Sequence, residues 1–200
     1  MKSLKTLAII LFFGGCKAQT PILDISESGT GLPNGYYLKD TYDLLNQFEG
    51  IYQYTNGSTI LKIVLVKKIQ QYNGKYYEDL IIGEYQYIEN GIEKVNTLSE
   101  LNTVYSNQRV HKIDSNFLVG NSFKLLPCTS CLTNEKRLYA SIMDTISKRY
   151  ADLIMRRTTE GGQEVMKIVI TNPSGGAYLE SEGPGPNFSL PLGELTLIKQ

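Results

Sequence analysis

The dipeptide Asn-Gly recurs along the first half of the chain and constrains its fold more than any other feature. It occurs at Asn34, Asn56, Asn73 and Asn90, and the last three are 17 residues apart. Asn and Gly accept a positive φ at low cost, which a type I′ hairpin turn needs at both of its central residues. The segments between these sites are rich in Ile, Val, Leu and Tyr, which suit a pleated sheet. Residues 48–91 therefore predict three antiparallel strands joined by tight turns.

The alternation of apolar and polar residues predicts which side chains of these strands face the core. Residues two apart along a strand lie on one face, and we extend that face across the Asn73-Gly74 turn. Lys62, Lys68 and Asp79 then point outward, and Gly83 is expected to mark a bulge where the inward face switches. The side chains predicted to line the interior are Tyr52, Leu61, Ile63, Leu65, Leu80 and Ile82.

The length of these strands predicts a curved sheet. A strand of about 15 residues, at roughly 3.3 Å per residue, would span roughly 50 Å. A domain of this size has a radius of gyration of only about 16 Å. A closed barrel bends such strands and also removes their exposed edges.

The remainder of the chain predicts further strands and no long amphipathic helix. A short helical turn is expected at Asp40–Asn46, before the first long strand. Additional strands are expected at Ile92–Thr97, Val110–Ile113, Phe117–Leu125, Arg137–Met143, Asp152–Arg157, Val165–Thr171, Ala177–Glu180 and Leu195–Lys199. The predicted fold class is therefore all-β, an antiparallel barrel of about eight to ten strands with a short N-terminal helical turn.

The N-terminus has the pattern of an export signal. Lys2 and Lys5 precede the apolar run Leu7–Phe13, and small residues follow it. Phe13-Gly14-Gly15-Cys16 resembles a bacterial lipobox, which implies lipidation of Cys16 and, with Lys17 next, an outer-membrane destination. Ordinary cleavage after Ala18 is the alternative. The expected organisation is an export signal at 1–18, a flexible tether at 19–35 and one barrel domain at 36–200.

The overall charge argues against a nucleic-acid partner. Lys and Arg together number 20, as do Asp and Glu, so the formal net charge is zero. A nucleic-acid-binding domain of this size is normally basic. The only predicted contact with a membrane is therefore the N-terminal lipid.

The pair Cys128 and Cys131 is the most specific local motif. A thioredoxin-like redox pair needs a following helix, whereas Leu132–Arg137 leads into a predicted strand. A zinc site needs about four ligands, and the chain has no second Cys pair. An exported protein meets oxidants, so we predict a structural disulfide between Cys128 and Cys131 and no metal site.

Catalytic constellations are not evident in the sequence. His111 is the one histidine, and no Gly-x-Ser-x-Gly motif marks a nucleophile. Glu78 and Asp79 are adjacent on a strand and so face opposite sides, while Glu180 and Glu182 lie beside a Gly/Pro-rich loop. The expected protein is not an enzyme, and no catalytic residue or cofactor is predicted.

Two resemblances add to these patterns. Phe48-Glu49-Gly50-Ile51-Tyr52 resembles the opening of a lipocalin-like barrel, with Tyr52 at the place of the family's Trp and with Arg156 and Arg157 as candidates for its late Arg. The segments YTNGSTILKIVL, YYEDLIIGEYQYIENGIEKVNTLSELNT and CxxCLTNEKRL resemble an uncharacterised family of small secreted bacterial proteins, a domain of unknown function. This second resemblance implies a fold and no chemistry.

These observations favour a non-catalytic envelope or secreted protein that binds a small apolar ligand or an envelope component in its barrel. A structural or interaction protein with a filled barrel and no ligand is the first alternative. An enzyme of unknown type is the second. The expected location is the outer membrane, the periplasm or the exterior. An eight-stranded barrel can be filled by its own side chains or can hold one small ligand, so the interior side chains decide between the first two functions.

Overall fold

The computed structural model describes residues 20–27, 31–121, 123, 127–175 and 186–200. The described residues form eleven strands and four short 3₁₀ turns. The strands are β1 (Ile22–Asp24), β2 (Tyr37–Lys39), β3 (Gly50–Asn56), β4 (Thr59–Tyr72), β5 (Tyr77–Glu89), β6 (Ile92–Asn96), β7 (Ile113–Val119), β8 (Arg137–Asp144), β9 (Arg149–Glu160), β10 (Gln163–Ser174) and β11 (Gly193–Lys199). The 3₁₀ turns are η1 (Ile25–Glu27), η2 (Asn46–Phe48), η3 (Leu98–Asn102) and η4 (Gln108–Val110). Among the described helical elements, none has the length and apolarity needed to cross a membrane.

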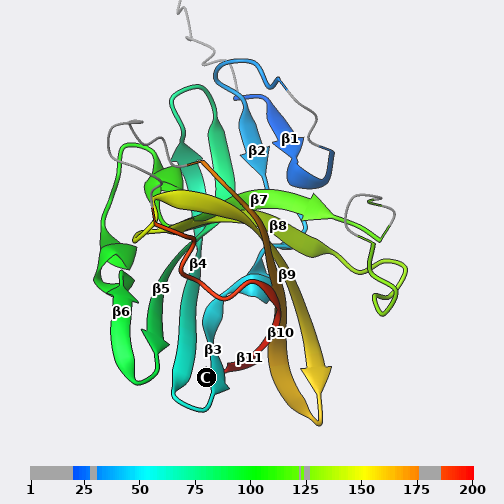
Figure 1. Cartoon of the computed structure of the whole chain (residues 1–200). Helices are drawn as coiled ribbons and strands as arrows, with labels where there is room; N and C mark the ends of the chain where they lie inside the picture. Colours follow the sequence, from blue (N-terminus) through cyan, green and yellow to red (C-terminus); the bar gives the residue numbers. More distant parts are fainter. Residues whose placement is uncertain (1–19, 28–30, 122, 124–126, 176–185) are drawn as a thin grey trace, which may run out of the picture.

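Eight of these strands close into an antiparallel barrel, which confirms the predicted fold class. The order β5-β4-β3-β11-β10-β9-β8-β7 returns to β5 through a β5–β7 pairing (Figure 1). The closing contact is short and joins Ile81, Ile82 and Gly83 to the start of β7. The same edge of β5 also pairs with β2 near Tyr77 and with β6 beyond Tyr85. One long central strand therefore organises the whole sheet.

A bulge in β4 sets the faces of β5 and corrects our assignment of two interior residues. Near the turn Gln71 lies opposite Glu78, but farther along Lys68 lies opposite Leu80, so one extra residue is accommodated on β4. Gln70 takes up this residue with a φ of 52°. A one-residue shift exchanges the two faces of a strand.

The correction concerns Leu80 and Ile82. Beyond the bulge Leu65 lies opposite Gly83 and Leu61 opposite Tyr87, so the odd-numbered residues of β5 face inward. Leu80 and Ile82 are buried, yet they lie on the other face of β5 and outside the main hydrophobic cluster. The other four predicted interior residues, Tyr52, Leu61, Ile63 and Leu65, do belong to that cluster.

Asp79 was also assigned to the wrong face. It lies on the inner face of β5, where its carboxylate stabilises the bulge. Its side chain is buried, and one carboxylate oxygen accepts the Gln70 N–H at 2.8 Å and the Tyr37 hydroxyl at 2.7 Å. The other oxygen accepts the Asp40 N–H at 2.9 Å. A buried carboxylate needs such donors, so Asp79 can sit on the inward side only at this end of the barrel.

Gly83 has a different role from the predicted bulge. The register of β4 and β5 runs unbroken from Ile60 to Lys68, so the face does not switch at Gly83. An added Cβ there would come within 2.6 Å of the Leu65 side chain and 2.9 Å of the Val64 carbonyl oxygen. Glycine is needed because three strands approach closely where the barrel closes.

The interior of the barrel is occupied by side chains of the chain itself. Tyr52 and Tyr85 are fully buried, and Tyr87 is almost so. Their rings pack among aliphatic residues, while the Tyr85 hydroxyl donates to the Met143 carbonyl at 3.0 Å and the Tyr52 hydroxyl to the Glu49 carbonyl at 3.1 Å. Tyrosine thus fills the volume with its ring and satisfies its hydroxyl with backbone. Three tyrosines of the first half of the chain, Tyr52, Tyr85 and Tyr87, therefore belong to the core, whereas Tyr42 and Tyr72 are exposed.

Within the segment 19–35, expected to be a flexible tether, the described residues 20–27 and 31–35 contribute to the sheet and the core. β1 lies parallel to β2, and the Tyr37 N–H donates to the Pro21 carbonyl at 2.8 Å. Ile25 and Leu32 are both buried in the main cluster. The polar composition of this segment therefore did not reveal that Ile25 and Leu32 pack in the core.

The chain between β2 and β3 closes one end of the barrel. Leu45 and Phe48 are completely buried, and the short helical turn predicted at Asp40–Asn46 is found one turn later, as η2. The Asp40 carboxylate accepts the N–H groups of Leu44 and Leu45 and forms an ion pair with Lys67 at 2.7 Å. The carboxylate thereby fixes the turn against β4.

The later strands lie close to their predicted positions, with two exceptions. The strand predicted at Phe117–Leu125 is found as β7, which ends at Val119 and so shares only residues 117–119 with the prediction. Val110–Ile113 was predicted as a strand, whereas η4 occupies Gln108–Val110 and β7 begins only at Ile113. The Asn107 side chain accepts the Arg109 N–H and so initiates the turn. The predicted strand at Ala177–Glu180 lies outside the described residues.

Candidate functional site

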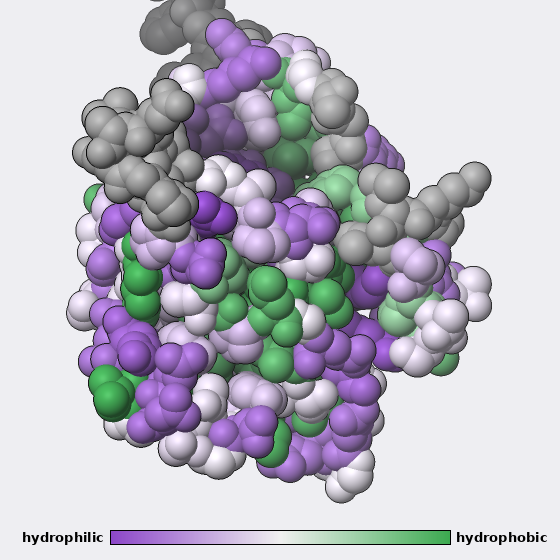
Figure 2. All heavy atoms as spheres, in the orientation of Figure 1, coloured by the Kyte–Doolittle hydropathy of each residue, from purple (hydrophilic) through white to green (hydrophobic). Residues whose placement is uncertain are grey.

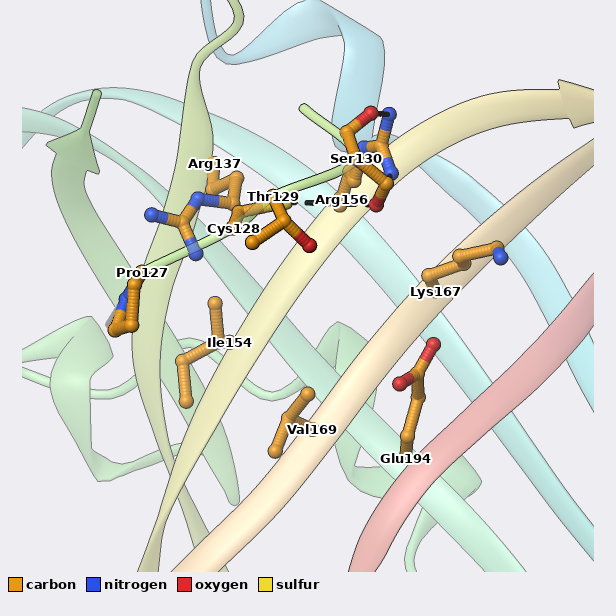
Figure 3. A pocket seen from close by; sticks show the side chains of 10 residues that line it. All are labelled: Pro127, Cys128, Thr129, Ser130, Arg137, Ile154, Arg156, Lys167, Val169 and Glu194. Carbon is orange, nitrogen blue, oxygen red and sulfur yellow. Dashed lines mark hydrogen bonds between the residues drawn. The ribbon is translucent and has the colours of Figure 1, made fainter. Parts of the chain in front are cut away.

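A groove lies on the outer surface of the barrel, over β8, β9 and β10. Its volume is about 200 Å³. The floor is formed by Ile154 and Val169, which lie opposite each other on β9 and β10 (Figure 3). Leu153 and Met155, the neighbours of Ile154, belong to the interior cluster, so Ile154 points outward. The outer face of these strands is therefore apolar where the groove lies.

The disulfide predicted between Cys128 and Cys131 is present and forms part of the groove wall. The two sulfur atoms are bonded at 2.00 Å, and residues 127–130 line the groove. Arg156 holds this loop to β9, because its guanidinium donates to the Ser130 hydroxyl at 3.0 Å and to the Ser130 carbonyl at 2.9 Å. The disulfide thus constrains a loop that covers the barrel wall.

Cationic side chains form the rim of the groove. Arg137, Arg156 and Lys167 come from three neighbouring strands, and Lys167 lies opposite Arg156. Arg156 forms a two-pronged ion pair with Glu135, and Lys167 contacts Glu160 at 2.6 Å. Glu194 of β11 is the acidic residue among the lining side chains (Figure 3).

Three aromatic rings continue the apolar row beside the groove. Phe117 lies opposite Tyr139, which in turn lies opposite Ile154. Phe123 completes the cluster, with ring centroids 6.2 Å from Phe117 and 6.4 Å from Tyr139. The Tyr139 hydroxyl donates to Asp152, and this hydrogen bond raises the pKa of Tyr139 to about 12. The rings extend the outward apolar surface to β7.

Hydrophobic residues are also exposed elsewhere. Figure 2 shows them gathered near the middle of the face that it presents, with hydrophilic residues around them. The groove is distinguished from other exposed apolar surface by its concave shape and its mixed lining.

His111 and Glu84 form a buried pair on the outer face of β5. The His111 Nδ1 atom lies 2.7 Å from the Glu84 carboxylate, and both side chains are fully buried. The Tyr105 ring packs edge-on against the imidazole. His111 Nε2 and the second Glu84 oxygen have no hydrogen-bond partner among the described residues. The pair resembles an acid–base arrangement, but no substrate can reach it as it stands.

A second polar cluster on the same face has a structural role. Arg109 donates to both oxygens of Glu78 at 2.7 Å and to Asp114 at 2.6 Å. Asn116 and Asn73 also donate to Glu78. The Arg109 contacts hold η4 against the outer face of β5, the face on which Leu80 and Ile82 are also buried.

The other predicted site residues are placed as follows. Cys16, Glu180 and Glu182 lie outside the described residues. Glu78 and Asp79 face opposite sides of β5, with separate partners. In the ranges that the structure describes, no group of three or more His, Cys, Asp or Glu side chains is arranged to hold a metal ion.

Sequence reasoning did not find the groove. Its residues come from β8 to β11 and from the disulfide loop, and no spacing in the sequence links them. One signal was available, because Leu153, Ile154 and Met155 form an uninterrupted apolar run. A strand that is apolar on both faces is covered on both faces. That run indicates a covered outer surface on β9.

Of three comparisons with known proteins, one gives a match. None of the curated proteins and none of the solved structures compared with the chain matches it. A family model described as "Family of unknown function (DUF6705)" matches residues 1–200. The match spans the entire sequence, so the chain is a member of this family of unknown function.

Proposed function

We propose that this chain is a non-catalytic, exported binding protein that uses the outside of a filled barrel. The observation that carries the proposal is the contrast between the two surfaces of β9. Leu153 and Met155 on the inner side pack in a filled core, whereas Ile154 on the outer side forms the floor of a groove. The sequence left open a ligand site inside the barrel. That site is less well supported than a site in the outer groove.

A non-catalytic role is supported by the surroundings of the titratable groups. The Glu84–His111 pair has no exposed side-chain surface. A general acid or base must come within hydrogen-bond reach of the substrate proton. At the groove, the Arg156 guanidinium already donates hydrogen bonds to Glu135 and Ser130. The residues that line the groove are therefore better suited to binding a ligand than to transferring a proton.

Chemical-shift mapping of the mature chain tests the proposal. A small library of neutral, anionic and cationic fragments would be titrated into ¹⁵N- and methyl-labelled protein. We expect the largest shifts at residues 127–130 and on the outer face of β9 and β10, including the Ile154 and Val169 methyl groups. Larger shifts at Leu61, Ile63 and Leu65 would place binding inside the barrel and would overturn the proposal.

The lipocalin-like relationship forms part of the same proposal. Tyr52, at the place of the lipocalin Trp, is fully buried close to the short turn η2. Arg157 lies near Tyr52, because Arg157 and Lys199 both donate to Glu164 and Lys199 lies opposite Tyr52. Arg157, rather than Arg156, is thus the better candidate for the late Arg of that family.

Export through a lipid anchor at Cys16 has its own test. Acyl chains anchor a protein by burying methylene groups, at about 0.8 kcal/mol each. We expect Cys16→Ser to move the protein from the membrane fraction to the soluble fraction of its host. The intact mass of the wild-type protein provides the check, because an unmodified N-terminus at Gln19 would show ordinary cleavage and refute the anchor.

A further inference from the structure

The distance along the chain between Cys16 and the folded barrel is short. The tether predicted at 19–35 would let an anchored barrel take any orientation, but β1 already begins at Ile22. Three residues, 17–19, separate Cys16 from Thr20, the first described residue. A chain extends by at most about 3.6 Å per residue, so a lipid on Cys16 would hold the start of the described fold within about 14 Å.

The turn between β4 and β5 lies beside the segment that carries β1 and β2. The Gly35 N–H, just before β2, donates to the Lys75 carbonyl in that turn at 3.0 Å. The Tyr77 N–H donates to the Tyr36 carbonyl at 2.8 Å. Figure 1 shows β1, β2 and this turn together at the top of the molecule. An anchor at Cys16 would therefore bring this end of the barrel to the membrane.

A row of apolar and aromatic side chains crosses the same end. Ile22 of β1 lies opposite Tyr37 of β2, which lies opposite Tyr77 of β5. Tyr77 lies opposite Tyr72 of β4, with ring centroids 5.2 Å apart. Side chains of paired residues project from the same face of a sheet. Ile22 is 53% exposed, Tyr72 47% and Tyr77 37%, and these three residues are called the exposed row below.

The chemistry of the exposed row suits the boundary between lipid and water. Tyrosine has an apolar ring and a polar hydroxyl, and it is enriched where a membrane meets water. Lys75 in the adjacent turn is exposed, and a lysine can extend its amine to lipid headgroups. The carboxylates of Glu78 and Asp79 are buried and accept hydrogen bonds, and Asp24 on β1 accepts backbone N–H groups. The row therefore presents rings and a cation to its surroundings.

We propose that the anchored barrel lies with this end against the membrane, and that the exposed row enters the headgroup region of the bilayer. This inference rests on the lipid anchor of the proposed function and adds the orientation in which the protein is held. One acyl chain alone gives weak and reversible attachment, and a second contact makes it stable. Ile22, Tyr72 and Tyr77 supply that second contact.

Vesicle binding of a singly acylated chain tests the contact. Cys128 and Cys131 form the disulfide, so Cys16 is the remaining cysteine and can be coupled to a tetradecyl maleimide in the mature chain. The coupled protein would be sedimented with vesicles of phosphatidylethanolamine and phosphatidylglycerol. We expect Tyr72→Ser combined with Tyr77→Ser to weaken binding about ten-fold, because two rings lose apolar contact with lipid. Ile22→Ser, on a separate strand, should weaken binding about three-fold.

A matched control comes from the other end of β5. Ile92 is 62% exposed and follows the turn between β5 and β6, whereas the exposed row lies where β5 begins. Ile92→Ser should leave vesicle binding within about two-fold of the unsubstituted chain. Amide spectra of each variant check that the barrel remains folded.

A paramagnetic lipid then reports the orientation directly. The ¹⁵N-labelled coupled chain would be placed on lipid nanodiscs that contain a gadolinium-chelating lipid. We expect the loss of amide signal to be greatest at residues 72–77 and in β1. The loss should be smallest at residues 57–58 and 90–92, which lie in turns at the other end of the barrel.

The outcomes separate this inference from the proposed function. Vesicle binding unchanged in the variants of the exposed row would refute the contact, and signal loss greatest at 57–58 and 90–92, or equal throughout, would refute the orientation. A dimer of the uncoupled chain that Tyr72→Ser and Tyr77→Ser abolish would assign the row to a second copy and overturn docking on lipid. All these results leave the outer groove and the anchor intact. An unmodified Gln19 N-terminus in the host would refute the anchor itself, and the orientation with it.

Discussion

Replacing Arg109 with methionine is expected to lower the free energy of unfolding by about 3–5 kcal/mol. The Glu78 side chain is 1% exposed, and Arg109 supplies two of its hydrogen bonds as well as its counter-charge. Asp114 would lose its cation in the same variant. Removal of one partner from a buried ion pair leaves an uncompensated charge, which costs more than the pair itself contributes. Urea denaturation of the mature chain measures the change.

Two further variants make this prediction specific. Lys94→Met removes a cation from the exposed pair with Glu89, at 3.8 Å, and should cost less than about 1 kcal/mol. Adding Glu78→Gln to Arg109→Met should recover part of the lost stability, because the buried charge disappears. If Arg109→Met lowered the free energy of unfolding no more than Lys94→Met does, the cluster of Arg109, Glu78 and Asp114 would not be what holds the η3–η4 segment on β5.

Truncation of Leu61 to alanine is expected to cost about 2–5 kcal/mol. Leu61 is fully buried, lies opposite Tyr54 and Tyr87, and belongs to the interior cluster. A filled interior has no space into which the neighbours can relax, so the truncation leaves a cavity. Thermal and urea unfolding, analysed with a two-state model, give the change in stability.

Val64→Ala is the control that tests which face of β4 points into the barrel. Val64 lies on the outer face of β4, opposite Glu84 and Ile51, and is partly exposed. Its truncation should cost clearly less than that of Leu61. The reverse order would exchange the two faces of β4, whereas a small loss at both positions would indicate an interior with space for a ligand.

The fold class follows from features that act within a few residues. Asn90-Gly91 forms the two-residue turn between β5 and β6, and both residues have the positive φ that a type I′ turn needs. Between β3 and β4 the two-residue turn is Gly57-Ser58, because Asn56 still pairs with Thr59, and Gly57 has the positive φ there. Strand length and alternation then leave a curved antiparallel sheet as the arrangement that buries one face of each strand. None of these steps needs knowledge of a distant contact.

The faces of β5 could not be obtained in this way. The bulge at Gln70 is stabilised by Asp79, which also binds Tyr37 and Asp40 from a segment far away in the sequence. A bulge shifts the register by one residue and exchanges the two faces of the strand. Leu80 and Ile82 therefore share one face, as predicted, but that face is the outer one. The outer face of β5 carries Glu78 and Glu84, but both are buried, and Asp79 is buried on the inner face, so charged residues did not distinguish the two faces.

Cys128 and Cys131 were paired correctly from the sequence, because their short separation leaves few alternatives. The groove that their loop borders was decided by tertiary structure alone. Arg137, Arg156 and Lys167 are unremarkable polar positions of three separate strands, and only the strand order β8-β9-β10 brings their charges to one rim. Turns and alternation are local properties that the sequence encodes directly, whereas register, barrel closure and the meeting of distant charges depend on which strands pair.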